Sequence, residues 1–370
     1  MNTDTNTKRT NAGNTRTTST MEWHANQGIP IGLRMAAWLF ALTVVCLSRS
    51  WAAEAKLGPQ SLITSSERVT QCTPGWTGER MADGRPKVAD EIIRRMKYVS
   101  ITEAWSTVGN NANAYEGPEG WKIMRPEEVI CGRVLTAQYL PARAEYSQLI
   151  TAQGKAEGRI GQYNSWPIDM LQKGDVYVAD GLGKVVNGTL IGDNLGNAIY
   201  AKSGNGVIFD GGVRDLEGLE EIKGFNAWVR GVHPSAIGGM MLMGINVPIH
   251  IGKAIVFPGD VVLAKHEGMV FIPAQLAERV VIESESTRVR DAWSHMRLWE
   301  GKYTPGQVDR GWSAEMTTDF VGWLKENRTS LVDKLHVPLE LLDSMIASGG
   351  RGGTSGRGGR GGTGGRVAPQ

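Results

Sequence analysis

Short apolar runs bounded by glycine, proline or aspartate recur through the middle of the chain, and they constrain the fold more than any other feature. Asp175–Asp180 alternates between two glycines and predicts a strand, and 206–210 is a short apolar strand. A helical segment over 194–203 separates them, and further strand-like runs crowd into 245–272. Strands that alternate with helices and are then followed by clustered strands predict a mixed α/β layered fold.

The flanking segments predict further elements. Residues 85–110 are predicted to be helical, with Ile92, Ile93, Met96 and Val99 on one face. A strand is expected around 126–140, a partly helical segment over 141–172, a break at Gly211-Gly212, and helix from Pro273 onward. Helices and loops are expected over 286–346, which carries Trp293, Trp299, Trp312 and Trp323.

The overall composition is that of a globular protein. Of the 370 residues, 41% are hydrophobic and 21% are charged, which excludes wholesale disorder, a collagenous repeat and a multi-span membrane protein. The formal net charge is +2, but both ends of the chain are basic, so 56–347 is mildly acidic. Binding of nucleic acid through bulk electrostatics is therefore not expected of this central part.

The N-terminal region has the pattern of an export signal. Residues 1–33 are rich in Thr and Asn and predict disorder. Arg34 precedes an apolar run over 35–47, which is shorter than the roughly 20 residues of a membrane span, and Ala53-Glu-Ala55 follows. We expect a signal peptide over 34–55, cleavage after Ala55, export to the periplasm and no stable membrane span afterwards. A buried or anchoring helix in a cytoplasmic protein is the alternative.

The C-terminal tail and the cysteines add little chemistry. Residues 348–370 are rich in Gly and Arg and predict a solvated, disordered tail, because Gly loses much backbone entropy on ordering. Nucleic-acid binding is not expected of this tail, because it contains no aromatic side chain that could stack on bases. Cys72 and Cys131 would remain after cleavage and could pair, but nothing in their spacing demands it. No Cys-x-x-Cys motif is present, so a cysteine zinc site is not expected.

The strongest local signal is Asp210-Gly-Gly-Val-Arg-Asp215, where an apolar strand ends beside an Arg-Asp pair. The Arg214 guanidinium can hold a substrate carboxylate bidentately. The Asp215 carboxylate can bind a hard divalent ion such as Mg²⁺, which takes one or two protein oxygens and keeps several waters. The competing interpretation is a surface salt bridge in a tight turn.

A second signal lies about twenty residues upstream. Gly192-Asp-Asn-Leu-Gly196 precedes the predicted helix, and the free N–H groups at a helix N-terminus bind anions. An Asp/Asn helix cap is the competing interpretation. The six histidines are scattered without the i, i+4 spacing of a helical metal site, so each is expected to be a packing or surface residue.

Together these residues resemble the RraA-like family, which includes class II 4-hydroxy-4-methyl-2-oxoglutarate (pyruvate) aldolases and the regulators of ribonuclease activity. The family signature is a glycine, about twenty residues, and then Arg-Asp, which Gly192 and Arg214-Asp215 match. The resemblance covers roughly 85–300. Further matches follow in order at Arg230–Pro234, Asn246–Pro248, Pro258–Asp260 and His266–Pro273.

The resemblance implies a layered α/β/β domain of the swivelling type also seen in phosphohistidine domains, assembled as homotrimers or homohexamers with sites between subunits. It implies that Arg214 binds the substrate carboxylate and the enolate oxygen and that Asp215 is the direct metal ligand. Substrate-binding positions would be Gly192, Asp193, Asn194, Leu195 and Arg214, with backbone N–H groups of 193–196 on the pyruvyl carboxylate. An acid of the neighbouring subunit, from Glu283, Glu285 or Asp291, would support metal-bound water.

The function implied by the resemblance is a lyase that uses Mg²⁺ or Mn²⁺ and cleaves a C–C bond of a small 2-oxo acid through a pyruvate enolate. It would be an aldolase of the 4-hydroxy-4-methyl-2-oxoglutarate type, an oxaloacetate decarboxylase, or both. The alternative is a non-catalytic binding or regulatory protein. Menaquinone methyltransferase is another label used in the family, but this sequence contains no cofactor-binding loop that would support that activity.

The expected domain organisation has five parts. They are a disordered N-terminus with the signal peptide (1–55), a linker or extension (56–84), the RraA-like domain (85–300), a helical C-terminal extension (301–347) and the Gly/Arg-rich tail (348–370).

Overall fold

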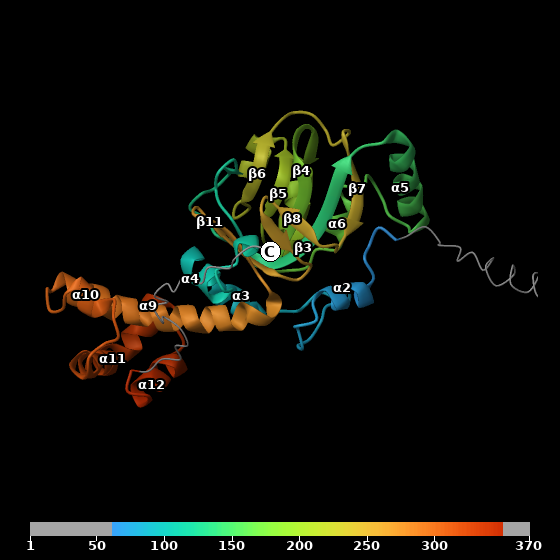
Figure 1. Ribbon diagram of the computed structural model, residues 1–370. Coiled ribbons are helices and arrows are strands. Elements are labelled where there is room, and N and C mark those ends of the chain that lie inside the picture. Colours follow the sequence, from blue (N-terminus) through green and yellow to red (C-terminus); the bar gives the residue numbers. More distant parts are fainter. Residues whose placement is uncertain (1–60, 351–370) are drawn as a thin grey trace, which may run out of the picture. The chain divides into compact units, whose positions relative to one another are not determined.

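The computed structural model describes residues 61–350 (Figure 1). The predicted signal peptide over 34–55 and all but the first residues of the predicted tail lie outside the described residues. Within 61–350, no helix is both long enough and apolar enough to cross a membrane.

One mixed sheet organises the described part of the chain, where nine strands join in the order β1-β11-β10-β3-β4-β5-β6-β2, with β7 paired to β3. The central strands β3 to β6 run parallel to one another, and the others are antiparallel to their neighbours. The strands are β1 (Tyr115–Glu116), β2 (Lys122–Ile123), β3 (Ile130–Pro141), β4 (Asp175–Ile191), β5 (Val207–Val213), β6 (Ala227–Val232), β7 (Met240–Ile245), β10 (Val261–Lys265) and β11 (Gly268–Ile272). A separate hairpin consists of β8 (Ile249–Ile251) and β9 (Ala254–Val256).

Helices connect and cover these strands. They are α2 (Ser66–Cys72), α3 (Asp90–Met96), α4 (Ile101–Thr107), α5 (Ala144–Ala156), α6 (Trp166–Asp169), α7 (Asp193–Ser203), α8 (Leu216–Glu220), α9 (Ala277–Trp299), α10 (Pro305–Val308), α11 (Ala314–Leu335) and α12 (Leu339–Ala347), with short 3₁₀ turns at Ala112–Ala114 and Ala274–Leu276. The mixed α/β fold class predicted from the sequence is confirmed, whereas its assignment to the phosphohistidine type stays a prediction.

The helix predicted over 85–110 is divided into α3 and α4. Its apolar face is as predicted, since Ile92, Ile93, Met96 and Val99 are all buried. The division occurs because Ser100 starts a new helix. Its hydroxyl accepts from the Glu103 N–H and the Glu103 carboxylate accepts from the Ser100 N–H, which is a capping box.

The predicted strand break at Gly211-Gly212 is wrong, because β5 continues through both glycines to Val213. They serve close packing instead of a turn. β4 extends past Asp180 to Ile191, and its register against β5 shifts in this extension. The backbone of Val185 there lies so near Gly212 that an added methyl carbon would be 3.2 Å from the Val185 Cα. Strand β7 was also not predicted from the sequence.

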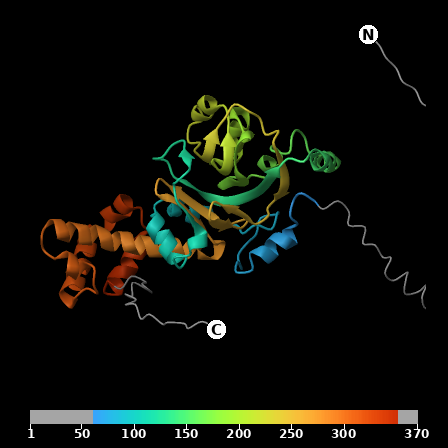
Figure 2. The ribbon, with the colours of Figure 1, turned by 45° about the horizontal axis from the view of Figure 1, so that its top comes forward.

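The two faces of the sheet bury different partners. On one face, side chains of the central strands such as Tyr177 and Phe209, whose rings meet edge-to-face at 4.9 Å, pack with α6, α7 and α8. On the other face, Val178 and Ile208 pack with the β8–β9 hairpin. The antiparallel strands β10 and β11 also pack with α3, α4 and the start of α9, and Figures 1 and 2 show these three helices side by side. The central strands therefore lie between helices and a hairpin.

The second half of α9 belongs to a separate helical core. Trp293 on α9 packs with Phe320 on α11, with ring centroids 5.7 Å apart, and with Trp312 at 4.4 Å. Leu342 and Met345 of α12 complete this core, and Figure 1 shows α10, α11 and α12 grouped around this end of α9. Because α9 contributes to two cores, the domain boundaries given above stay predictions.

Candidate functional site

The two sequence motifs separated by about twenty residues meet at one edge of the sheet. β4 ends at Ile191 and Gly192 precedes α7, while the neighbouring strand β5 ends just before Arg214 and Asp215. The approach is close. A methyl carbon added at Gly192 would lie 2.2 Å from Asp215 Oδ2 and 3.1 Å from Arg214 Nε. Only a residue without a Cβ leaves room for this arrangement, so the glycine spacing in the sequence has a direct structural reason.

Backbone hydrogen bonds to both neighbouring strands hold Arg214 in place. The Arg214 N–H donates to the Ile191 carbonyl at 3.0 Å, at the end of β4. On the other side, the His233 N–H donates to the Val213 carbonyl at 3.1 Å, just after β6. Arg214 therefore lies at the end of a rigid platform of three strands. Such a platform positions functional groups more accurately than a free loop does.

The Arg214 and Asp215 side chains form a half-exposed ion pair. Arg214 Nε donates to Asp215 Oδ2 at 3.1 Å, and the two side chains are 38% and 45% exposed. Asp215 has φ of 55°, a left-handed conformation that Asp tolerates but rarely adopts. Such backbone conformations are frequent at functional sites. The Arg214 guanidinium has four further N–H donors for a ligand.

The first turn of α7 offers fewer free donors than the sequence suggested. The Gly196 N–H donates to the Gly192 carbonyl at 2.9 Å, and the Asn194 N–H donates to the Asp193 carboxylate at 2.7 Å. Within the described residues, the N–H groups of Asp193 and Leu195 remain without an intrahelical acceptor, as in the first turn of any α-helix. An anion at this helix start would therefore bind the N–H groups of Asp193 and Leu195.

Close packing of α7 against α8 sets the position of Asp193. A methyl carbon added at Gly218 would lie 2.7 Å from Asp193 Cβ, and one added at Gly196 would lie 2.3 Å from Leu219 Cδ2. The Asp193 side chain is thus held against the backbone of α8 at Gly218.

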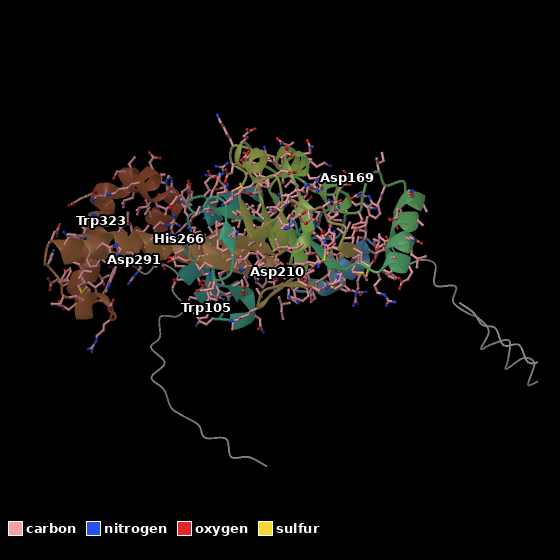
Figure 3. All side chains as sticks on the ribbon, turned by 90° about the horizontal axis from the view of Figure 1, so that it is seen from above. Trp105, Asp169, Asp210, His266, Asp291 and Trp323 are labelled. Carbon is pink, nitrogen blue, oxygen red and sulfur yellow. The ribbon has the colours of Figure 1, made fainter. Side chains whose placement is uncertain are left out.

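The acids predicted to reach a neighbouring subunit interact within their own chain. Glu285 is buried and accepts two hydrogen bonds from Arg95, at 2.6 and 2.8 Å. Glu283 accepts from Arg279 at 2.7 Å and from Thr107, and Asp291 also has a partner here. In Figure 3, Asp291 lies on the side of the C-terminal helices, apart from Asp210. Glu285 is the least suitable of the three, because leaving Arg95 would break a buried ion pair.

A second polar cluster was not predicted from the sequence. Asp180 on β4, Asp210 on β5 and His250 on β8 each place one ligand atom within 4.8 Å of the others. Burial raises the pKa of the Asp180 carboxyl and the Asp210 charge acts in the same direction, while the Leu182 N–H, His250 and the Gln138 side chain oppose the shift. The only sequence signal for this cluster is that Asp180 and Asp210 both end apolar runs.

A third polar feature is a cavity of about 330 Å³ beside residues 72–75, with Asp260 among its lining residues. Asp260 is buried and accepts a hydrogen bond from the Phe257 N–H at 2.8 Å. Burial raises the pKa of Asp260 to about 7, and the Phe257 N–H limits this shift. On β3, Cys131 is buried and burial raises the pKa of its thiol to about 12, so it is unreactive. Cys72 and Cys131 are both free.

Comparison with known proteins adds the family to this geometry. Residues 98–271 match the family described as RraA-like, Aldolase/RraA, and this segment contains Gly192, Arg214 and Asp215. Residues 98–271 are similar to the RraA-like family. The resemblance seen in the sequence is therefore confirmed. The RraA-like family includes both aldolase/decarboxylase enzymes and regulatory inhibitors, and its members are typically oligomeric.

Individual relatives are distant. An uncharacterized protein of Methanocaldococcus jannaschii is 27% identical over 101 residues, which is 27% of this chain and 48% of that protein. The crystal structure of an uncharacterized protein from Pseudomonas syringae pv. tomato is 20% identical with a TM-score of 0.49, and covers 63% of this chain and 98% of that one. Streptomyces coelicolor RraAS2, described as an unusual member of the RNase ES inhibitor RraA family, is 23% identical with a TM-score of 0.43, and covers 59% and 96%.

Proposed function

We propose that the protein is a divalent-metal-dependent lyase that cleaves a C–C bond of a small 2-oxo acid through a pyruvate enolate. The aldol cleavage of 4-hydroxy-4-methyl-2-oxoglutarate and the decarboxylation of oxaloacetate both belong to this class. The observation that carries the proposal is the convergence of Gly192, Arg214 and Asp215, which lie so close together that a Cβ at position 192 would clash with the Asp215 carboxylate. Similarity to the RraA-like family supports it, because the family contains such enzymes.

Each group of the site has a role in the proposed reaction that follows from its chemistry. The N–H groups of Asp193 and Leu195, at the positive end of α7, bind the pyruvyl carboxylate. Arg214 uses its Nε on Asp215, and its remaining donors bind the substrate oxygen on which negative charge develops. Backbone hydrogen bonds on both sides of the strand end fix the position from which the Arg214 side chain starts.

The half-exposed Asp215 carboxylate fits a hard divalent ion, Mg²⁺ or Mn²⁺. Such an ion takes one or two carboxylate oxygens from the protein and keeps several waters, and Asp215 is open enough for a hydrated ion. When bound, the ion supplies Lewis-acid stabilisation to the 2-oxo acid. We further propose that the active protein is a homotrimer or homohexamer.

The test is turnover of oxaloacetate by the purified protein, followed as pyruvate formation with Mg²⁺ or Mn²⁺ and again with a chelator. Arg214→Lys keeps the charge but loses the planar two-pronged geometry. It should lower kcat/KM at least about a hundredfold, which corresponds to roughly 2.7 kcal/mol of transition-state stabilisation. Arg143→Lys is the matched control, because Arg143 also forms an exposed ion pair with an acid close in sequence and lies outside the site.

Asp215→Ala should abolish both activity and metal dependence while the protein stays folded, since this exposed carboxylate supports little packing. Equal turnover by the wild type and Arg214→Lys would contradict the assignment of Arg214. If the wild type turns over no 2-oxo acid with either ion, the alternative of a non-catalytic binding or regulatory protein takes precedence.

A further inference from the structure

Two buried aspartates stand side by side on the sheet. Asp180 and Asp210 are register partners on the parallel strands β4 and β5. Their side chains share the face with Val178 and Ile208, which the β8–β9 hairpin covers. His250 reaches them from β8, and its Nε2 lies 3.6 Å from Asp180 Oδ2. Three strands distant in sequence thus bring two carboxylates and an imidazole together.

Asp180 is the member of this cluster that lacks a complete set of partners. Its side chain is 0% exposed. Its Oδ1 accepts from the Leu182 N–H at 3.0 Å, whereas its Oδ2 has no hydrogen-bond partner within residues 61–350. A buried carboxylate oxygen without a donor is costly. This oxygen is one of the three ligand atoms that converge.

The arginine beside the cluster, Arg230, is shared between Asp210 and Glu116, an acid outside the cluster. Arg230 Nε donates to Asp210 Oδ1 at 2.7 Å, its Nη2 lies 3.4 Å from Glu116 Oε1, and its guanidinium stacks on Trp121 at 3.9 Å. Among the described residues, the hydrogen bond to Asp210 Oδ2 is a long one, 3.3 Å, from the Gly252 N–H. Arg230 therefore neutralises one side of Asp210, and the oxygens that face His250 lack a full cationic partner.

We propose that Asp180, Asp210 and His250 bind a divalent transition-metal ion of the Mn²⁺ or Zn²⁺ kind. Two carboxylate oxygens and an imidazole nitrogen suit these ions, whereas Mg²⁺ and Ca²⁺ prefer oxygen ligands throughout. His250 is 54% exposed, so the ion can enter from solvent and keep water at its remaining positions. Binding would tie the hairpin to β4 and β5.

This site does not depend on the proposed lyase function. None of its three ligands is Gly192, Arg214 or Asp215, so either an enzyme or a binding protein of this fold would have it. The ion proposed for Asp215 would be bound by oxygen, whereas the ion proposed here would be bound partly by nitrogen. That difference makes the two sites distinguishable by spectroscopy.

The experiment is a titration of the chelator-treated full-length protein with Mn²⁺, followed by calorimetry and by pulsed electron paramagnetic resonance for ¹⁴N coupling from imidazole. The wild type should show one nitrogen-coupled Mn²⁺ that Zn²⁺ displaces. His250→Gln should remove the ¹⁴N coupling and weaken this binding at least about tenfold, as expected for loss of a ligand. Asp180→Asn should weaken it as well.

Two control variants separate this site from other binding. His266→Gln changes an exposed histidine on the turn between β10 and β11 and should leave the ¹⁴N coupling intact. Asp215→Ala should also leave it intact, even though that change would remove the ion proposed for the lyase site. Absence of ¹⁴N coupling in the wild type, or its persistence in His250→Gln, would overturn the proposal. Because His250 is half-exposed, its variant should fold even if Asp180→Asn does not.

Discussion

Gly192→Ala tests the site through a contact that the structure defines. The backbone at Gly192, with φ of −118° and ψ of −166°, is extended and open to any residue. The new methyl carbon would lie 2.2 Å from Asp215 Oδ2, while ordinary contacts begin at about 3.4 Å. The carboxylate must therefore move by about 1 Å, and the Arg214 Nε, at 3.1 Å, must also adjust. A displacement of about 1 Å in an active site can lower activity about a hundredfold.

The assay is kcat/KM for oxaloacetate with saturating Mg²⁺, together with urea unfolding. We expect about a hundredfold loss of kcat/KM. The loss of stability should be about 1 kcal/mol, because Ala is a poorer N-cap than Gly and the half-exposed Asp215 carboxylate can move away from the new methyl group. Gly238→Ala is the matched control, since a methyl group there meets nothing within 4 Å. It should leave both quantities unchanged.

A double-mutant cycle tests the contact itself, independently of any activity. In an Asp215→Ala background the clash with the carboxylate is absent, so Gly192→Ala should cost less stability than it does in the wild type. Wild-type kcat/KM in Gly192→Ala would refute the claim that Asp215 and Arg214 must hold their positions. Equal destabilisation in both backgrounds would refute the contact.

Three further predictions concern pH, assembly and processing. The folded-state pKa of Asp260, about 7, lies above its ordinary value of 3.8, so its contribution to stability is complete below about pH 4 and is lost as the pH rises through 7. Relative to Asp260→Asn, the wild-type free energy of unfolding should fall by up to about 4 kcal/mol between pH 4 and pH 8, measured in urea; parallel pH profiles would contradict this. Light scattering should show a trimer or hexamer, and a stable, active monomer would speak against intersubunit sites. Mass spectrometry of the native protein should find an N-terminus near Lys56, whereas an intact Met1 in the cytoplasm would exclude export.

The local pattern of the sequence was sufficient for much of the fold. The apolar periodicity at Ile92, Ile93, Met96 and Val99 predicted their burial, because a helix face is determined by residues three and four apart. The run Asp175–Asp180 and the segment Asn194–Ser203 likewise correspond to the first part of β4 and to nearly all of α7. These are short-range properties that need no knowledge of distant partners.

The sequence also indicated which residues form the candidate site, but not their geometry. The spacing of Gly192 and Arg214-Asp215 pointed to a shared location, and only the structure shows that a Cβ at position 192 would lie 2.2 Å from Asp215 Oδ2. In the helix, the Gly196 N–H donates to the Gly192 carbonyl, so this N–H group is not available to an anion as predicted.

Strand register and long-range packing determined the rest. Gly211-Gly212 has the composition of a turn, but the extension of β4 covers it and keeps it in a strand. Asp180, Asp210 and His250 lie up to 70 positions apart in sequence, and each taken singly has an unremarkable setting. Their meeting depends on which strands become neighbours and in what register. That choice is made by the burial of whole sheet faces, which no local pattern of residues encodes.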